Sequence, residues 1–472
     1  MLELIQSVNS AVNNFIWGVP AMICIIGVGL LLTIKTKFLQ IRKFPYAMKE
    51  TLGRVFKKQD ASDGSMTPFQ AVCTALASTV GTGNIAGVAG AIAIGGPGAV
   101  FWMWISAILG MCTKFSEVTL AVHFRERNQE GDYVGGPMYY IKNGLSKNWH
   151  FLAVLFSAFG VLTVFGTGNA TQVNTITTAI NSALLNFHVI SQSSVGTANL
   201  IIGIIVAILV ALILLGGIKR IGQVAERLVP FMAFIYIFFA LGVVVLNIDQ
   251  LPAVFGSIIN GAFHPASVTG GIVGSFFMSM KKGVARGIFS NEAGLGSAPI
   301  AAAAANSDSP AQQGLISMTG TVIDTIIICT MTGLSIVLTG AWQQEGLEGV
   351  QVTTYAFQKG LPISEQVAAF LLMLCLVFFA FTTILGWDYY SERCLEYLSG
   401  KHKKAILVYR WLYILAVFIG PYMTVKAVWT IADIFNGLMA IPNMIAIFAL
   451  SGVVVKETKD FFKRHAEQNQ FK

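Results

Sequence analysis

The fold of this 472-residue chain is decided by the stretch Ala77-Ser78-Thr79-Val80-Gly81-Thr82-Gly83-Asn84-Ile85-Ala86-Gly87. The stretch is rich in glycine and hydroxyl side chains, yet it lies inside a segment, 68–93, that otherwise has the composition of a membrane-spanning helix. A spanning segment must satisfy its own backbone, because lipid offers no hydrogen bonds. A helix that stops and restarts at mid-depth is therefore tolerated only where the freed groups face protein, water or a ligand. In transporters this place is commonly the substrate and ion site.

The composition around this stretch predicts an all-α polytopic membrane protein that has the lipid bilayer as its solvent. The chain is 55% hydrophobic and only 11% charged, whereas a soluble domain carries about 25% charged residues. Apolar runs of roughly 18 or more residues follow one another, which is the length a helix needs to cross a bilayer. The net charge of +8 reflects basic loops on one side of the membrane, so nucleic acid is not an expected partner.

The apolar runs predict about eleven transmembrane helices in a single membrane domain, 1–472. The first span lies near 15–34, and ten more lie near 68–93, 97–122, 151–186, 199–217, 223–247, 268–285, 314–341, 363–391, 405–424 and 427–455. The remaining residues, 456–472, are expected to form a cytoplasmic tail.

The basic residues predict the orientation of these spans. The first span is followed by a strongly basic loop, and only Lys359 and Lys426 of the 31 Lys and Arg residues fall on the opposite side. Cytoplasmic loops carry an excess of Lys and Arg. We therefore expect a multi-pass protein of the plasma (inner) membrane, with its N-terminus outside and its C-terminus in the cytoplasm.

The ten later spans divide into two blocks of five, 68–247 and 268–455. Because five is odd, the two blocks must have opposite orientations in the membrane. Each block is predicted to open with an interrupted helix, at Thr79–Asn84 in the first block and at Gly270–Gly283 in the second. Paired interruptions in two inverted halves indicate a binding site near the midplane.

Just past the first interruption the chain reads Gly95-Gly96-Pro97-Gly98-Ala99-Val100-Phe101-Trp102-Met103-Trp104-Ile105-Ser106-Ala107-Ile108-Leu109-Gly110. This run resembles the signature of the alanine or glycine:cation symporter family, within the amino acid-polyamine-cation superfamily. Three other stretches are also similar to that family: Gly135-Gly136-Pro137-Met138-Tyr139-Tyr140, Ser290-Asn291-Glu292-Ala293-Gly294-Leu295-Gly296 and Gly386-Trp387-Asp388-Tyr389-Tyr390. The resemblance covers essentially the whole chain.

The resemblance implies a leucine-transporter-type core of five plus five inverted helices, preceded by one peripheral helix at 15–34. It implies inward symport of a small neutral amino acid with Na⁺, or less often H⁺, and no cofactor besides the coupling ion. A passive facilitator and an amino-acid sensor remain alternatives. A membrane enzyme is disfavoured, since the H-E-x-x-H and Walker A patterns are both missing from the sequence. The oligomeric state stays open.

The first interruption offers the groups that a zwitterionic amino acid needs. Free N–H groups near Gly81, Thr82 and Gly83 can receive a carboxylate, helped by the positive end of the following half-helix. Carbonyls freed around Thr79 and Val80 can accept from an ammonium or coordinate a cation, and Asn84, which ends the polar run, is a further candidate for binding the substrate. The alternative is helix packing, because Gly83 and Gly87 have the G-x-x-x-G spacing.

The resemblance assigns further residues to the substrate. Gly274, Phe277 and Met280 would line the side-chain pocket, and Trp387 would close it. Such a tight pocket would favour alanine, glycine or serine over leucine, although a preference for glutamine stays open. Ordinary apolar packing is the alternative for Phe277 and Met280.

A polar run in the third core span contributes one more candidate. Gln172, by resemblance, would donate to the substrate carboxylate. Asn169 and Asn174 in the same run could instead hydrogen-bond across helices.

The same architecture implies one sodium site between the first and the eighth core helices. Its ligands would be the carbonyls of Ala77 and Val80 and the hydroxyls of Thr382 and Thr383, since a hard cation prefers oxygen. Threonine hydroxyls in a span can also bond back to a preceding carbonyl of their own helix. A second ion near Asn84 is a further possibility.

Five ionisable residues are expected at or near membrane depth: Lys114, Glu117, Asp324, Asp388 and Asp433. Such groups are functional candidates by default. Lys114 and Glu117 stand three apart and could neutralise each other as a structural pair. Asp324 is the candidate for proton coupling.

The stretch Lys281-Lys282…Arg286…Glu292 is predicted to form a gate of ion pairs on the cytoplasmic side. It could equally be an anchor of the kind that the positive-inside rule describes.

Overall fold

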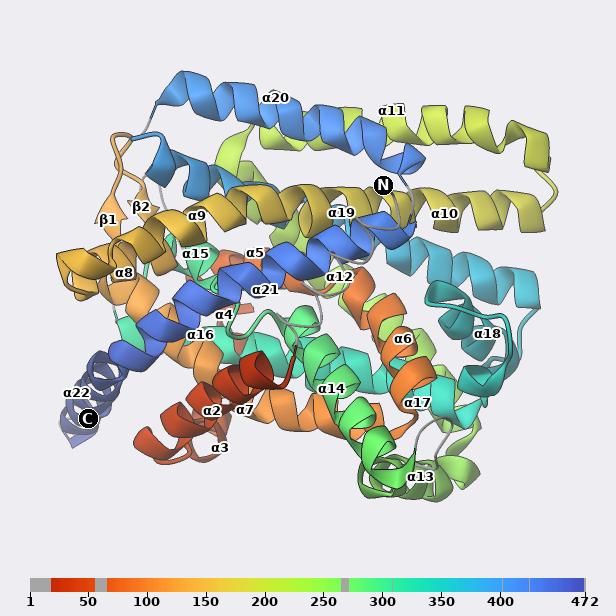
Figure 1. Cartoon of the computed structure of the whole chain (residues 1–472), viewed down its shortest axis with the longest axis horizontal. Helices are drawn as coiled ribbons and strands as arrows, with labels where there is room; N and C mark the ends of the chain where they lie inside the picture. Colours follow the sequence, from red (N-terminus) through yellow and green to blue (C-terminus); the bar gives the residue numbers. More distant parts are fainter. Residues whose placement is uncertain are drawn as a thin grey trace.

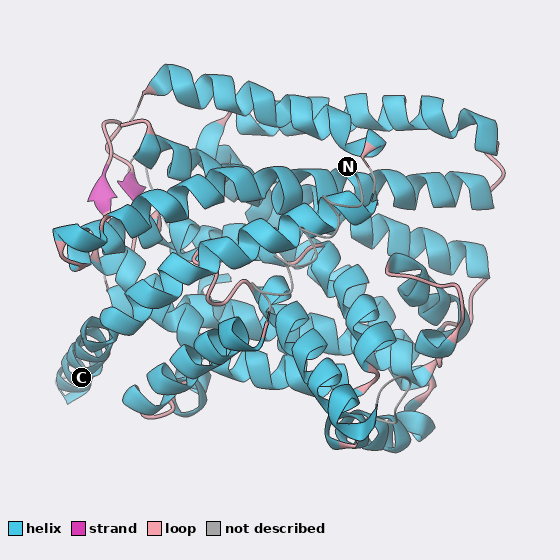
Figure 2. Cartoon of the chain, in the orientation of Figure 1, coloured by secondary structure: helices cyan, strands magenta, loops and turns pink. Residues whose placement is uncertain are grey.

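The computed structural model describes residues 18–55, 66–264, 271–307, 309–400, 402–423 and 425–470, and these residues form a bundle of helices with one small hairpin (Figures 1 and 2). The elements are α2 (Val19–Lys35), α3 (Leu39–Arg42), α4 (Phe44–Val55), α5 (Pro68–Thr79), α6 (Ala86–Gly95), α7 (Gly98–His123), β1 (Glu126–Arg127), β2 (Tyr133–Val134), α8 (Pro137–Gly144), α9 (Phe151–Thr163), α10 (Thr171–Asn186), α11 (Val195–Leu214), α12 (Gly217–Leu246), α13 (Leu251–Phe263), α14 (Gly271–Asn291), α15 (Ala298–Ala303), α16 (Pro310–Thr321), α17 (Thr330–Leu338), α18 (Val350–Gly360), α19 (Glu365–Leu398), α20 (Lys403–Ile419), α21 (Val425–Ala449) and α22 (Ser451–Gln470).

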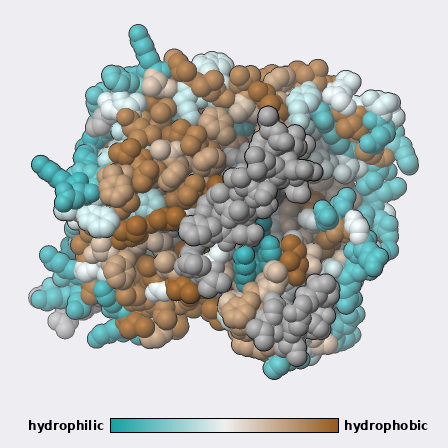
Figure 3. All heavy atoms as spheres, viewed as in Figure 1, coloured by the Kyte–Doolittle hydropathy of each residue, from teal (hydrophilic) through white to brown (hydrophobic). Residues whose placement is uncertain are grey.

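The long apolar helices match the predicted spans. Within the described ranges, seven helices are long and apolar enough to cross a membrane, and two bent pairs raise the number to nine. The shorter apolar helix α2 and the first helix of the second half, α14, occupy the two remaining predicted positions. Figure 3 shows hydrophobic side chains mostly over the middle of the molecule and hydrophilic ones gathered at its left and right ends.

The first half opens with the predicted interruption. Thr67 begins α5 with a capping box, in which its hydroxyl accepts from the Gln70 N–H and its own N–H donates to the Gln70 side chain, each at 3.1 Å. The helix ends because Val80 is extended, with φ −77° and ψ 90°. A single 3₁₀ turn over Thr82–Asn84 follows, and α6 leaves at 60° to α5. The interruption expected at Thr79–Asn84 is confirmed.

The second interruption lies elsewhere than predicted. Helix α14 runs without a break from Gly271 to Asn291, so the expected interruption at Gly270–Gly283 is wrong for the residues that the structure describes; Gly270 lies outside them. The chain leaves the helix at Glu292, whose φ is +56°. Gly294 and Gly296 also have positive φ, and α15 then begins at Ala298.

Gly283 of α14 serves close packing rather than a break. A Cβ on Gly283 would lie 2.3 Å from the Ala99 carbonyl oxygen of α7. A Cβ on Gly95, at the end of α6, would lie 3.1 Å from the Ser279 Cα. Helices α6 and α14 therefore pack along each other (Figure 1) and bring the two real interruptions to the same level.

Two further helices are locally widened. A π-helical segment, Val164–Ala170, joins α9 to α10 and coincides with the polar run that contains Gly166 and Asn169. A second π-helical segment, Val322–Cys329, joins α16 to α17 and carries Asp324. Such segments occur frequently at functional sites, since they redirect side chains and free backbone groups.

The last span ends earlier than predicted. Helix α21 stops at Ala449 rather than at 455, and α22 continues at 59° to it. The predicted tail, 456–472, is helical as far as Gln470, and its last two residues lie outside the described part.

The two half-helices α5 and α15 are tied together at their outer ends. The Met66 N–H donates to the Ala304 carbonyl (3.1 Å), and the Asn306 N–H donates to the Met66 carbonyl (2.7 Å). Arg125, just after α7, donates to the carbonyls of Ala303 (3.2 Å) and Ala305 (2.6 Å). One guanidinium thereby satisfies carbonyls that the end of α15 would leave unpaired.

Candidate substrate and ion site

Gly81 is held between two other helices at the centre of the first interruption. A Cβ at this position would lie 2.6 Å from the Thr383 hydroxyl oxygen on α19 and 3.5 Å from the Gln172 amide oxygen on α10. Only glycine leaves this space open. The structure thus brings together Gly81, Gln172 and Thr383, which the sequence singled out separately.

Asn84 closes the interruption. Its amide oxygen accepts from the Gly81 N–H at 2.9 Å, so the Gly81 N–H, which was expected to be free for a carboxylate, is already used. The Thr332 hydroxyl of α17 donates to the Asn84 carbonyl at 2.8 Å. The Thr82 hydroxyl is buried and has no hydrogen-bond partner among the described residues. Gly83 packs against Phe289, to which its Cβ would come within 3.2 Å.

Asp324 connects the two interruptions. Its carboxylate accepts from the Asn84 amide (2.7 Å), from the Ser290 hydroxyl at the end of α14 (2.7 Å) and from the Thr325 hydroxyl (2.7 Å). The Asn291 amide donates in turn to the Thr325 hydroxyl at 3.0 Å. The π-helical segment therefore places one buried carboxylate against both broken helices.

The predicted sodium ligands are partly assembled. The Thr383 hydroxyl lies 3.1 Å from the Ala77 carbonyl oxygen of α5 and 2.9 Å from the Phe379 carbonyl oxygen of its own helix. Three oxygens thus meet between α5 and α19. The Thr382 hydroxyl instead bonds back to Phe379 at 3.0 Å and contacts the Met232 sulfur at 3.4 Å, as the back-bonding alternative described. Val80 is fully buried beside this group.

Gln172 and Trp387 lie on the two helices that face Gly81. The Gln172 amide nitrogen donates to the Thr167 carbonyl within its own helix (3.0 Å), and its buried oxygen has no partner in the described part of the chain. Trp387 is 1% exposed and packs on Gly168, where a Cβ would lie only 2.2 Å from its own Cβ. The predicted donor nitrogen of Gln172 is therefore engaged.

The predicted side-chain pocket on α14 is not found at the interruption. Phe277 is 49% exposed and contacts Phe276 edge-on, so it does not line a buried pocket in this structure. Met280, partly buried, lies eleven residues before Asn291, which is about 16 Å along a helix. Gly274 belongs to the part of α14 whose surroundings lie outside the described residues.

The residues of α14 that do reach the first interruption are Phe289 and Ser290, which lie against Gly83. Asn291 and Glu292 follow them at the second interruption. The sequence signal for this region is the pair of glycines, Gly294 and Gly296, within the polar stretch Ser290–Gly296.

Glu117 caps the second interruption. One of its oxygens accepts from the N–H groups of Gly294 (3.0 Å) and Gly296 (3.1 Å) and from the Asn443 amide (2.6 Å). Lys114 is 4% exposed, and its ammonium has no hydrogen-bond partner among the described residues. Lys114 and Glu117 interact through space, as their expected mutual neutralisation requires, but share no hydrogen bond in the described part of the chain.

The other ionisable candidates lie apart from this site. Asp388 is buried on α19, one turn before Glu392, which forms a two-point ion pair with Arg410 (2.6 and 2.8 Å). The Asp433 side chain lies outside the described part.

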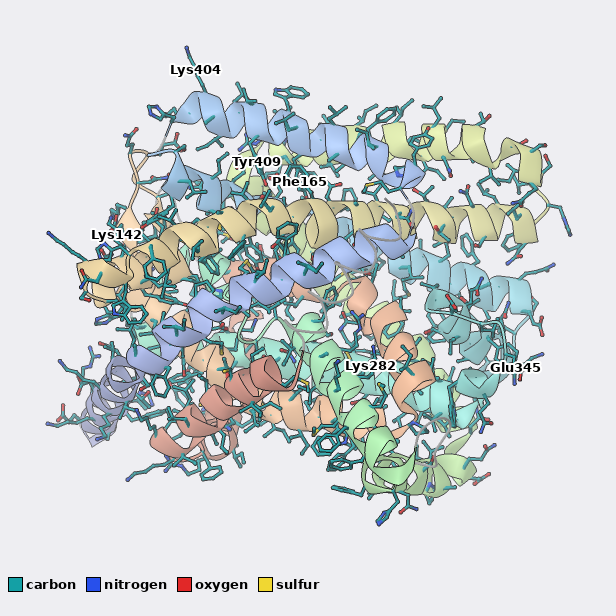
Figure 4. All side chains as sticks on the ribbon, viewed as in Figure 1. Lys142, Phe165, Lys282, Glu345, Lys404 and Tyr409 are labelled. Atoms are coloured by element: carbon teal, nitrogen blue, oxygen red, sulfur yellow. The ribbon has the colours of Figure 1, made fainter. Side chains whose placement is uncertain are left out.

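Glu292, the acidic end of the predicted gate, lies at the second interruption. Glu292 is buried and accepts from the Ser297 hydroxyl at 2.5 Å. The Arg286 guanidinium lies over the Phe289 ring, 5.3 Å from its centroid. Figure 4 shows Lys282 on α14, where the helix passes α6.

Comparisons with known proteins agree with this architecture. The model of the sodium:alanine symporter family matches residues 2–472. An uncharacterised transporter of Haemophilus influenzae is 50% identical, over 99% of both chains. The sodium/alanine symporter AgcS of Methanococcus maripaludis is 44% identical over 98% of both chains. The probable sodium/glutamine symporter GlnT of Bacillus subtilis is 38% identical, over 98% of this chain and 92% of its own.

Among solved structures, MhsT in complex with L-phenylalanine is similar with a TM-score of 0.54, covering 86% of this chain and 99% of that one. The leucine-transporter-type fold that the resemblance implied is confirmed. At 13% sequence identity this likeness shows the fold alone, whereas the match over residues 2–472 shows more: the chain belongs to the sodium:alanine symporter family.

Proposed function

We propose that this protein takes up a small neutral amino acid, alanine or glycine, together with Na⁺ by alternating access. One observation carries the proposal: the interrupted helix at Gly81 lies against the Gln172 oxygen and the Thr383 hydroxyl, and Thr383 also meets the Ala77 carbonyl. The space proposed for the substrate and the oxygens proposed for Na⁺ are thus adjacent, and Thr383 contacts both. The relatives named for sodium and alanine or glutamine support the same pairing of ion and substrate.

The amino acid would bind along the 3₁₀ turn. The Thr82 hydroxyl and the N–H groups of Thr82 and Gly83 are suited to its carboxylate, at the positive end of α6. The free Gln172 oxygen is an acceptor, so we assign it to the substrate ammonium rather than to the carboxylate. Trp387, pressed against Gly168, would limit the size of the side chain.

Sodium would bind between α5 and α19. The Ala77, Val80 and Phe379 carbonyls and the Thr383 hydroxyl offer oxygens, and Thr382 would join them if its side chain turned away from Phe379. Hard oxygen ligands suit Na⁺ as they suit other hard cations. Asp324 is the proton-binding candidate if the coupling ion is H⁺, because it is the carboxylate that joins both interruptions.

The basic residues support the proposed orientation in the plasma (inner) membrane. Figure 4 shows Lys142 and Lys404 toward one end of the molecule and Glu345 at the other. We assign the end with Lys142 and Lys404, hereafter the basic side, to the cytoplasm. The N-terminus would then lie outside.

Uptake by the purified protein in proteoliposomes tests the proposal. Labelled alanine or glycine should accumulate under an inward Na⁺ gradient and stop accumulating when the gradient is collapsed. A competition series with serine, glutamine and leucine ranks the substrates, and an imposed pH gradient replaces Na⁺ if the ion is H⁺. Flux that ignores both gradients would identify a facilitator, and binding without flux would identify a sensor.

A further inference from the structure

A cavity lies beside the substrate site, on its basic side. It is lined by α5 (Val72, Ala75, Leu76, Thr79), by α7 (Lys114, Val118), by Asn291 and Ala298 at the second interruption, and by α16 (Ser317, Gly320, Thr321). From Thr79 to Val72 it follows α5 for about 10 Å. Thr79, which the sequence assigned to the substrate, thus faces this cavity.

Three polar groups in the wall of this cavity have no hydrogen-bond partner in the described part of the chain: the Lys114 ammonium and the hydroxyls of Ser317 and Thr321. All three side chains are at least 93% buried. Burying such groups without a partner costs free energy. Lys114 is also the charged side chain among the lining residues.

The three carboxylates that interact electrostatically with Lys114 are not its hydrogen-bond partners. Glu117, Glu292 and Asp324 act on Lys114 through space, but the Lys114 ammonium has no hydrogen bond to any of them. Glu292 accepts from Ser297, and Asp324 accepts from Asn84 and Ser290. One Glu117 oxygen accepts from Gly294 and Gly296, and the other has no partner among the described residues. The cavity therefore holds the Lys114 ammonium and two hydroxyl groups, which can donate together.

We propose that this cavity is a second, transient subsite that receives the carboxylate of the amino acid on its way to the cytoplasm. The proposal rests on the proposed function and adds a release step to it. An ammonium and two hydroxyls match the two oxygens of a carboxylate. A zwitterion is neutral overall, so it tolerates the neighbouring acidic groups better than a free anion does.

The cavity volume of about 20 Å³ holds one water-sized occupant. The amino acid therefore enters only after α5 moves away from α16, which is a step that alternating access requires on this side.

The experiment compares transport from the two sides of the membrane. Alanine transport is measured in right-side-out and in everted vesicles that carry the whole protein. For Lys114→Met, the KM at the basic side should rise about tenfold or more, because a hydrogen bond to a charged group is worth about 1.5–3 kcal/mol. The KM at the opposite side should change less than about twofold. At a fixed overall equilibrium, the ratio of maximal rate to KM on one side of the membrane is tied to the same ratio on the other side. The maximal rate from the basic side should therefore rise together with its KM, as expected when binding of the ground state is lost.

Further variants separate this role from a structural one. Lys114→Arg should restore the KM, and Ser317→Ala or Thr321→Val should raise it about threefold while keeping every charge. Ser116→Ala is the matched control, since that hydroxyl donates to Cys112 within α7. Equal changes on both sides, or none, would overturn the subsite.

A dependence of the basic-side KM on chloride, tested against gluconate, would assign the cavity to an inorganic anion and would equally overturn the subsite. Failure of the wild-type protein to transport alanine or glycine would instead refute the proposed function itself.

Discussion

Gly81 shows how a single missing side chain creates the candidate site. The space that a Cβ would fill is bounded by Thr383 and Gln172, which come from α19 and α10. Neighbouring glycines have other tasks, because Gly83 gives room to Phe289 and Gly95 to α14. The residue type is the same at each position, and the contact decides its role.

We predict that Gly81→Ala abolishes amino-acid transport. Its Cβ would come within 2.6 Å of the Thr383 hydroxyl, so either the oxygen group or the interruption must shift. Gly90→Ala in α6 is the matched control, because nothing lies within 4 Å of its Cβ; it should retain transport and gain up to about 1 kcal/mol of stability. Uptake assays and thermal melting in detergent measure both effects, and equal transport by the two variants would contradict the prediction.

Thr383→Ala should raise the sodium concentration for half-maximal uptake about tenfold. The hydroxyl meets the Ala77 and Phe379 carbonyls, and its loss removes one oxygen from the proposed ion site. Thr354→Ala, which loses only a bond to Val350 in its own helix, should leave the sodium dependence unchanged. An unaltered sodium titration for Thr383→Ala would place the ion elsewhere.

Asp324→Asn should lower stability by about 2–4 kcal/mol. The carboxylate accepts from three donors, and an amide nitrogen in its place would turn a donor toward one of them. Thermal melting should show a fall of several degrees. The exposed Asp249→Asn should melt like the wild type, and a normal melting curve for Asp324→Asn would mean that this carboxylate does not hold the two interruptions together.

At the scale of elements, the two half-helices on the basic side behave as a joined unit. Backbone bonds link Met66 to Ala304 and Asn306, and Arg125 holds the end of α15. Two different half-helices of the inverted repeats are therefore coupled by a few hydrogen bonds at their outer ends. If α5 moves without α15, these hydrogen bonds must break.

Arg125→Gln should loosen this unit. Amide hydrogen exchange should rise in 298–307 and in 66–79, because the carbonyls of Ala303 and Ala305 lose their donor. Arg127→Gln is the control, since that side chain bonds exposed groups of its own hairpin. Exchange that rises equally in both variants would show that the hairpin, and not Arg125, holds the end of α15.

At the scale of the whole molecule, we expect the charge distribution to set the orientation in the membrane. An impermeant thiol reagent should label Glu345→Cys in intact cells, whereas Lys404→Cys should be labelled only after the membrane is opened. Both residues are exposed, and Figure 4 places them at different ends. The wild type, with Cys24 as its exposed cysteine among the described residues, gives the background. The reverse labelling pattern would invert the topology.

The sequence by itself determined the class, the spans and the first interruption of this protein. Hydropathy is a local property, and a bilayer imposes a similar minimum length on every spanning helix. The run Thr79–Asn84 could be recognised because glycine, hydroxyl and amide side chains together weaken a helix wherever they occur. The polar run that became a π-helical segment was visible for the same reason.

Only the tertiary structure decided where the second interruption lies and which residues reach it. Glycine in a span permits either a break or close packing, and the neighbouring helix selects between them. Opposite α7, Gly283 became a packing position, whereas Gly294 and Gly296 opened the chain against Glu117. The contacts of Lys114, Asp324 and Thr383 likewise depend on residues far away in the sequence, so no local pattern could have fixed them.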